Sequence, residues 1–237
     1  DYADTTNNVI NFRPEIDFPL PFTNSTTREL DHTDVIAKLY NADIEVYING
    51  GVTFEGGVNP LVTEIGMNYG KGIKINRGKF FLECDFTGWH DCIRLEEGEL
   101  FLSNSRMEGS YSTAGGNGLK AINASFAQLA NCKILNSRHA IAVGGSTQDG
   151  AEAIATNCVF GDTRQSQNST TYPSDESRCV DTHGNCKRLI LTNCRLYGGL
   201  QYGGRLIKAD NCYIRAQSLT PIEPRSDDLK DGTQAYF

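Results

Sequence analysis

The sequence has no excess of positive charge, no long apolar run and few prolines. Its 237 residues contain 22 Lys and Arg against 29 Asp and Glu, which gives a formal net charge of −7. Nucleic-acid-binding domains are normally basic, so this balance argues against a nucleic-acid partner. No stretch of about 18 consecutive apolar residues is present, which argues against a membrane-spanning helix. The 7 prolines, against 24 glycines, indicate that most turns are built without proline.

Motifs for cofactors and for secretion are also missing. The chain carries no CxxC pair, no HExxH and no EF-hand loop, so neither a metal nor another cofactor is expected. It opens on the polar segment DYADTTNNVINF, which has no signal-peptide pattern. It also lacks an initiator Met, as a processed chain or a fragment of a longer protein would.

What the sequence does contain is an internal repeat built around Asn-Cys. The phrase occurs as QLANCKILNS, AIATNCVFGD, LILTNCRLYGG and KADNCYIRA, after two degenerate copies, FLECDFTG and LFLSNSRMEG. The aligned Cys or Ser residues are 84, 105, 132, 158, 194 and 212, so the spacings are 21, 27, 26, 36 and 18 residues. A supersecondary unit repeated at this length, with insertions, is typical of solenoids.

A second short phrase precedes most copies and alternates apolar with polar or small residues. It occurs as GIKI (72–75), CIRL (92–95), GLKA (118–121), AIAV (140–143) and CVDT (179–182). Alternation with a period of two indicates strands, so each repeat holds three short strands. A single coil cannot bury its apolar face, but coils stacked at about 4.8 Å can. The sequence therefore predicts an all-β parallel β-helix.

The Asn-Cys pair has a structural interpretation in this fold. Each Asn is expected at the bend before the third strand, where stacked Asn side chains can hydrogen-bond with one another. Each Cys is expected to face inward as a small hydrophobe. The geometry of stacked coils does not favour disulfides, so we interpret the cysteines as an inert stack of free thiols, which suggests assembly in a reducing compartment.

The Asn-Cys repeat, the alternating strands and the Gly-rich turns resemble the pectin-lyase-like β-helix superfamily, and within it phage tailspike and tail-fibre domains. The resemblance covers about residues 40–216 and implies a single-stranded, right-handed parallel β-helix of about 6–8 coils. Residues 1–39 are expected to form an N-terminal cap, with a short helix within 27–42, and 217–237 a C-terminal tail. The strict six-residue repeat of the rival left-handed solenoid is absent.

In this superfamily the ligand groove runs along the outer face of the first strand of each coil. The resemblance therefore places Lys74, Arg94 and Lys120 in a cationic row that would hold an anionic sugar, unless nearby acids such as Glu96 neutralise it. Asp181 is expected to point outward in the same row.

Two further substrate contacts are expected beside this row. Arg178 lies just before a first strand. Trp89, the single tryptophan, lies in a turn expected to be exposed, where it would provide a stacking platform for a sugar ring or anchor its loop.

The segment CVDTHGNC (179–186) is the densest cluster of reactive side chains. Asp181 and His183 can act there as acid and base, or Asp181 can orient the imidazole; alternatively, His183 only caps backbone groups in a turn. A glycosidase would need two carboxylates, and a lyase a base with cations. The candidate carboxylates are Asp181 with Asp91, Glu96 or Asp175, and the candidates for elimination are His139, His183, Arg94 and Lys120. The polygalacturonase branch is not expected, because its NTDG and Asp-Asp motifs are absent.

The resemblance implies a tailspike-like protein of the phage virion that acts at the host cell surface. Such a protein would bind and cleave a bacterial surface polysaccharide, as a glycoside hydrolase or a polysaccharide lyase. It would be a homotrimer attached to other virion tail proteins, without nucleic acid or membrane partners. The alternatives are a non-catalytic structural or glycan-binding module of a virion (baseplate, fibre or capsid decoration) and a secreted microbial lyase.

Overall fold

The structure, a computed structural model, is built from strands. It describes residues 3–4, 9–12, 45–55, 71–75, 78–89, 91–109, 116–135, 137–145, 150–161, 179–216 and 220–237. These residues contain no helix and form one sheet of 20 strands. Every pairing in that sheet is parallel except the one between β1 (Ala3–Asp4) and β2 (Val9–Phe12).

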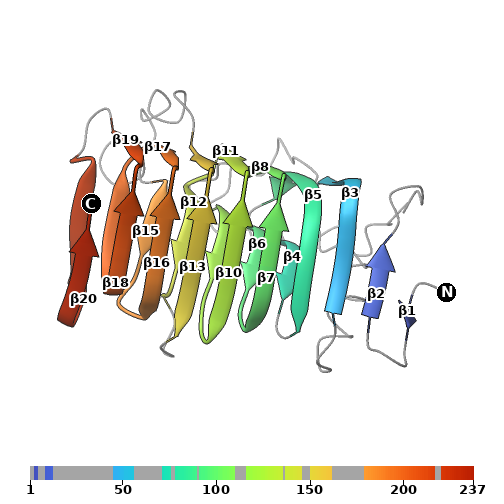
Figure 1. Ribbon diagram of the computed structural model, residues 1–237, viewed down its shortest axis with the longest axis horizontal. Coiled ribbons are helices and arrows are strands. Elements are labelled where there is room, and N and C mark those ends of the chain that lie inside the picture. The colour runs from blue at the N-terminus through green and yellow to red at the C-terminus, as the bar shows by residue number, and fades with distance from the viewer. Residues whose placement is uncertain are drawn as a thin grey trace, which may run out of the picture.

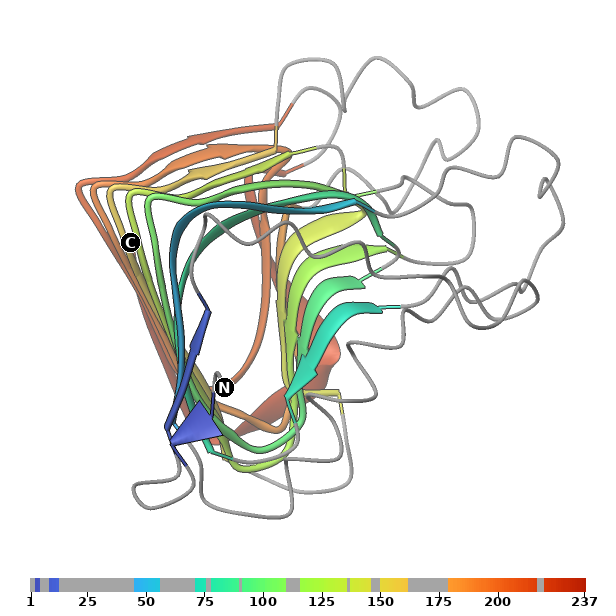
Figure 2. The same ribbon diagram turned by 90° about the vertical axis from the view of Figure 1, so that its right-hand side faces the viewer.

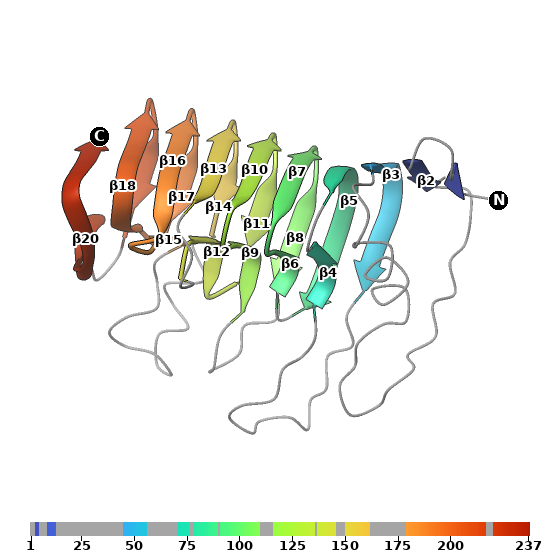
Figure 3. The same ribbon diagram turned by 90° about the horizontal axis from the view of Figure 1, so that it is seen from below.

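The strands stack in three ladders that run the length of the molecule (Figures 1 and 3). Ladder A consists of β4 (Lys71–Ile75), β6 (Asp91–Leu95), β9 (Asn117–Ala121), β12 (His139–Val143), β15 (Val180–Thr182) and the start of β18 (Leu200–Asp210). Ladder B consists of β2, β3 (Glu45–Glu55), β5 (Lys79–Trp89), β7 (Gly98–Ser103), β10 (Ser125–Ala130), β13 (Ala151–Thr156), β16 (Cys186–Thr192) and the end of β18. Ladder C consists of the second half of β5, β8 (Arg106–Gly109), β11 (Lys133–Leu135), β14 (Val159–Phe160), β17 (Arg195–Tyr197) and β19 (Tyr213–Arg215).

Seen down the stack, the three ladders outline the sides of a triangle (Figure 2). The chain passes from ladder A to B to C and then to the next coil, which is the arrangement of a parallel β-helix, as predicted from the repeats. The predicted helix within 27–42 lies outside the described residues, as does most of the predicted cap in 1–39.

The core of the solenoid consists of columns of apolar side chains in register. In ladder A one column is fully buried through six successive strands and contains Ile73, Ile93, Leu119, Ile141, Val180 and Leu200. No coil could bury these residues alone, so each coil stabilises its neighbours.

The predicted Asn column is present at the corner between ladders B and C. Asn104, Asn131, Asn157, Asn193 and Asn211 all have a left-handed backbone, with φ between 48° and 56°. Asn tolerates this region better than most residues. The Nδ2 atoms of Asn131, Asn157 and Asn211 donate to the Oδ1 atoms of Asn104, Asn131 and Asn193 at 3.3, 3.3 and 2.7 Å.

Five of the eight cysteines form the expected inward-facing stack beside the Asn column: Cys84, Cys132, Cys158, Cys194 and Cys212. All eight are free thiols, and seven are buried, while Cys212 in the last repeat is half-buried. Ser105 replaces Cys in one coil, and its Oγ accepts a 3.0 Å hydrogen bond from the backbone N–H of Cys84.

The C-terminal tail contributes a strand that the sequence analysis did not predict. β20 (Ile222–Tyr236) pairs in parallel with β18 over most of its length, with two register shifts. The tail thereby covers the last coil, and its polar sequence suits a strand whose other edge has no pairing within the described residues. This placement brings residues of the tail to the end of ladder A.

Candidate functional site

The outer face of ladder A carries one continuous column of mostly polar residues. In register along the stack, the column contains Lys74, Arg94, Lys120, Ala142, Asp181, Gln201 and Glu223. A second polar column lies beside it because two successive residues, Cys92 and Ile93, are both buried and interrupt the alternation. Asp91 and Arg94 therefore lie on the same side of the sheet, and Oδ2 of Asp91 is 3.8 Å from Nη1 of Arg94. The second column runs Lys71, Asp91, Asn117 and His139.

Asp181 is the centre of a cluster at the C-terminal end of these columns. Its Oδ2 lies 3.2 Å from Nε2 of His183 and 3.8 Å from Nε2 of His139. Nη2 of Arg225, on β20, donates to both carboxylate oxygens at 3.0 and 2.9 Å, and to Oε1 of Gln201 at 3.1 Å. The Asp181 carboxylate therefore joins β12, β15 and β20, and Arg225 extends the cluster to β18.

Asp181 faces out of the core, as expected, but it is not exposed. Its side chain is only 2% accessible, because His139, His183 and Arg225 surround it. The neighbouring Thr182 fixes the strand: its Oγ1 donates to the carbonyl of Gly203 at 3.0 Å and accepts from the N–H of the same residue at 2.9 Å.

His183 is held in place from two sides. Its N–H donates to the carbonyl of Val143, and its carbonyl accepts the N–H of Cys186, at 2.9 and 2.8 Å. A Cβ atom on Gly145 would lie 3.2 Å from Cδ2 of the imidazole, so the ring rests on glycine backbone. His183 is 29% accessible and His139 only 9%, so His183 is the member of the pair that a ligand can reach more easily.

The electrostatics of the cluster keep Asp181 ionised. Burial by itself raises the pKa of its carboxyl group. The hydrogen bond from His183 and the charges of His139, His183 and Arg225 outweigh burial and lower the pKa well below its ordinary value. A carboxylate in this state cannot act as a general acid, but it can orient an imidazole and stabilise its protonated form.

The other half of the face is dominated by paired charges. Nε of Arg94 donates to Glu96 at 2.9 Å, and Oδ1 of Asp91 accepts from the side chain of Asn117 at 2.7 Å. Arg94 is thus neutralised by two acids, as the alternative interpretation of the cationic row proposed.

The remaining expected substrate contacts are only partly described. Lys120 is partly buried and in register with Arg94. Lys74 lies in β4, and Trp89 is the last residue of strand β5 rather than part of the expected turn. The side chains of both lie outside the described part of the structure, as do Arg178 and Asp175 entirely.

Three residues of the site were missed by the sequence analysis: Gln201, Glu223 and Arg225. Gln201 lies at the start of β18, and the other two lie in β20, which was interpreted as a tail. The segment TPIEPR contains two prolines and no alternation, so no signal in it predicted a strand.

Coil spacing separates the candidate carboxylates. Asp91 and Asp181 are three coils apart, which corresponds to about 14 Å at about 4.8 Å per coil. Retaining and inverting glycosidases need about 5–5.5 Å and about 6.5–9.5 Å respectively, so neither Asp91 nor Glu96, which follows the same strand, matches Asp181 as a catalytic pair. Glu223 is two coils from Asp181, about 10 Å by the same spacing, and lies close to the upper limit for inversion.

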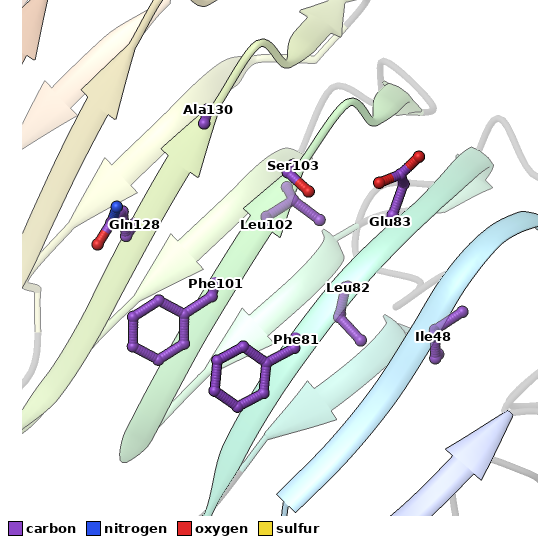
Figure 4. Close-up of a pocket in the computed structure, with 9 residues that line it drawn as sticks. All are labelled: Ile48, Phe81, Leu82, Glu83, Phe101, Leu102, Ser103, Gln128 and Ala130. Carbon is purple, nitrogen blue, oxygen red and sulfur yellow. The ribbon is translucent and has the colours of Figure 1, made fainter.

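A separate hollow of about 190 Å³ lies on the outer face of ladder B. Phe81 and Phe101 form one wall of it, with Glu83, Ser103 and Gln128 around the rest (Figure 4). The Phe81 ring stacks between Tyr47 and Phe101, with centroids 4.8 Å apart on both sides and interplanar angles of 7° and 8°. Both faces of the Phe81 ring are therefore covered, whereas Phe101 meets its other neighbour, Phe126, at an angle of 59°.

Comparison of the chain with family models, with curated proteins and with solved structures found no match. Among the described residues, no group of three or more His, Cys, Asp and Glu side chains is arranged to hold a metal ion. The same part of the chain contains no helix that could cross a membrane.

Proposed function

We propose that the chain is a tailspike-like virion protein of the pectin-lyase-like, right-handed type, which binds and cleaves a host surface polysaccharide along ladder A. The observation that carries the proposal is the cluster of His139, Asp181, His183 and Arg225 at the end of a polar face. Its support is physical: two imidazoles around a buried carboxylate with a lowered pKa form a proton-transfer arrangement.

The geometry favours elimination over hydrolysis. In a lyase, His183 would accept the proton from the carbon next to the sugar carboxylate. The C–O bond to the leaving sugar would break as the C=C bond forms, and water would protonate the leaving oxygen. Asp181 would orient the imidazole ring and stabilise the imidazolium that forms. Arg225 would supply positive charge near the uronate, and His139 a hydrogen-bond donor. A hydrolase would instead need a carboxylic acid opposite Asp181, for which Glu223 is the one candidate on the described part of ladder A near a suitable distance.

The sequence segments that lead into ladder A agree with a substrate site on that ladder. Residues 56–70, 110–115 and 162–178 immediately precede described residues at the starts of β4, β9 and β15, all in ladder A. Long insertions on a rigid scaffold are a usual place for binding residues, and Arg178 belongs to one of them.

Digestion of a panel of bacterial surface polysaccharides tests the proposal, with reducing ends and ultraviolet absorbance followed together. Elimination yields both signals, and both should be lost in His183→Gln but retained in Glu223→Gln. Reducing ends without absorbance, abolished by Glu223→Gln, would mean hydrolysis. Silence with the glycan of the native host would overturn cleavage.

A non-catalytic virion module is the second candidate, and ladder B favours it. Its outer face carries a mostly apolar column that includes Tyr47, Phe81, Phe101, Ile154 and Ile190, all partly exposed, with the exposed Gln128 between Phe101 and Ile154. An apolar sheet face of this length suits packing against a second subunit, as in the homotrimer expected from the resemblance, or against another tail protein. Light scattering of wild type and Phe101→Glu checks this: a trimer that dissociates in the variant supports the interface, and a monomeric wild type contradicts it.

A further inference from the structure

Three cations on the outer face of ladder C make no ion pair within the described part of the chain: Lys133 on β11, Arg195 on β17 and Arg215 on β19. All three are exposed. Elsewhere in the described structure, most cations have a carboxylate partner: Lys79, Arg94, Arg106, Lys187, Arg188, Lys208 and Arg225. On a chain with a net charge of −7, a face with several uncompensated positive charges is a candidate anion-binding surface.

Aromatic residues alternate with these cations at the end of the ladder. Arg195 is in register with Tyr213, and Tyr197 with Arg215, so the four side chains form a two-by-two pattern across β17 and β19. The rings of Tyr197 and Tyr213 lie 6.0 Å apart at an angle of 59°, and Tyr213 is 53% exposed. Because the rings are tilted rather than stacked, neither covers the whole face of the other. Figure 1 shows β17 and β19 next to each other, with β11 further along the same row.

The Asn column borders the same face and adds neutral hydrogen-bonding groups. Asn131, Asn193 and Asn211 are exposed, and each lies two residues before Lys133, Arg195 or Tyr213. An amide offers two N–H donors and two acceptor lone pairs, and the bonds within the column use only part of that capacity. The surface thus combines cations, aromatic rings and amides, which suit acidic groups, sugar rings and hydroxyl groups respectively.

We propose that the outer face of ladder C, from β11 to β19, binds an anionic polysaccharide lengthwise along the stack. Arg195, Arg215 and Lys133 contact its carboxylate or sulfate groups, and Tyr213 packs against a sugar ring. The surface ends toward the N-terminus, where Arg106 is paired with Glu108 and its backbone N–H with Asp85. It differs from the site on ladder A and does not depend on catalysis there.

One observation favours a polysaccharide over a single-stranded nucleic acid. Nucleic-acid grooves are basic along their whole length, whereas here the apolar Val159 separates Lys133 from Arg195 in the column.

Affinity electrophoresis tests the proposal, with the full chain run through gels that contain alginate, dextran sulfate, neutral dextran or single-stranded DNA. We expect retardation by alginate or dextran sulfate, or by both, and weakening at high salt. Arg195→Ser/Arg215→Ser should weaken this binding by about tenfold or more. The control Lys187→Ser/Lys208→Ser removes the same charge from exposed, paired positions on ladder B and should leave binding within about twofold of wild type.

Several outcomes would overturn the proposal. One is unchanged retardation in Arg195→Ser/Arg215→Ser, and another is an equal loss of retardation in the ladder B control. The others are retardation by neutral dextran alone and stronger retardation by DNA than by either anionic glycan. Circular dichroism of each variant excludes misfolding as the cause of a loss. His183→Gln should lose cleavage but keep retardation, so failure of the ladder A proposal and failure of this one are distinguishable.

Discussion

Removing the guanidinium of Arg225 tests whether the buried carboxylate organises the end of ladder A. Arg225→Ala removes one of the three side chains that cover Asp181 and leaves the carboxylate with only the two histidines beside it. Loss of one partner from a buried ion pair costs about 3–5 kcal/mol. Because the Arg225 side chain is 30% accessible and His183 remains in contact, we expect a smaller decrease in the free energy of unfolding, of about 2 kcal/mol.

The matched control for this variant is Arg215→Ala. Arg215 lies in the same terminal region of the solenoid, is exposed, and makes no ion pair with the described residues. Its removal should change the free energy of unfolding by no more than about 0.5 kcal/mol. Urea denaturation gives the global values, and hydrogen exchange of the β20 amides reports whether the loss is concentrated in the last coil.

The effect of Arg225→Ala should also depend on pH in one direction. The pKa of Asp181 is lowered in the folded state, whereas an unfolded Asp titrates near pH 4. The unfolded state therefore binds more protons as the pH falls below about 5, and the contribution of the pair is present above this range and declines below it. The difference between wild type and Arg225→Ala should shrink toward pH 3. The role assigned to the pair would be refuted if Arg225→Ala lowered the free energy of unfolding no more than Arg215→Ala does. It would also be refuted if the effect of Arg225→Ala did not change between pH 7 and pH 3.

Three further predictions concern the scaffold. Asn157→Ala should lower the free energy of unfolding by about 2 kcal/mol, because Ala loses the hydrogen bond to Asn131 and also disfavours φ of 56°. Asn157→Gly loses only the hydrogen bond and should lower it by about 1 kcal/mol. Equal decreases for the two variants in urea denaturation would contradict this. A thiol reagent should modify only Cys212 in the native protein and all eight cysteines after unfolding, because the other seven are buried; rapid modification of a second thiol would contradict the stack. Gly118→Ala places a Cβ atom 2.0 Å from Cγ2 of Ile134 and should lower the free energy of unfolding by more than about 3 kcal/mol, measured by thermal denaturation. In Gly232→Ala the new Cβ atom meets no atom within 4 Å, and the positive φ alone should lower it by about 1 kcal/mol. Similar decreases for the two variants would contradict the close packing at Gly118.

The architecture was predictable because a solenoid repeats its local signals. Alternation in segments such as GIKI and CIRL predicted the strands of ladder A, and the structure places them in β4 and β6. The Asn-Cys pairs predicted both the left-handed corner and the buried thiols, since each copy repeats the same backbone requirement. β20 carries no copy of the repeat, so its pairing with β18 could not be predicted in this way.

The candidate site was predictable only in part, because its residues come from different coils. The pattern CVDTHGNC singled out Asp181 and His183, and the strand alignment also suggested His139. His139 can contact Asp181 because two successive buried residues near the start of the ladder A strand place His139 on the outer side of the sheet. Arg225 lies 44 residues after Asp181 in the chain, and only the docking of β20 brings the two together. Arg94, which the sequence analysis placed in a cationic row, is paired with Asp91 and Glu96 in the structure.

A crystal structure of the protein with an oligosaccharide from a polymer that it binds is the most direct test of the central claim, that the chemistry takes place on ladder A. The account predicts a sugar ring over β12 and β15, with its acidic group near Arg225 and its reacting carbon within reach of the His183 imidazole. An oligosaccharide bound only on another face, with His183 and Asp181 untouched in a protein that still cleaves the polymer, would contradict it.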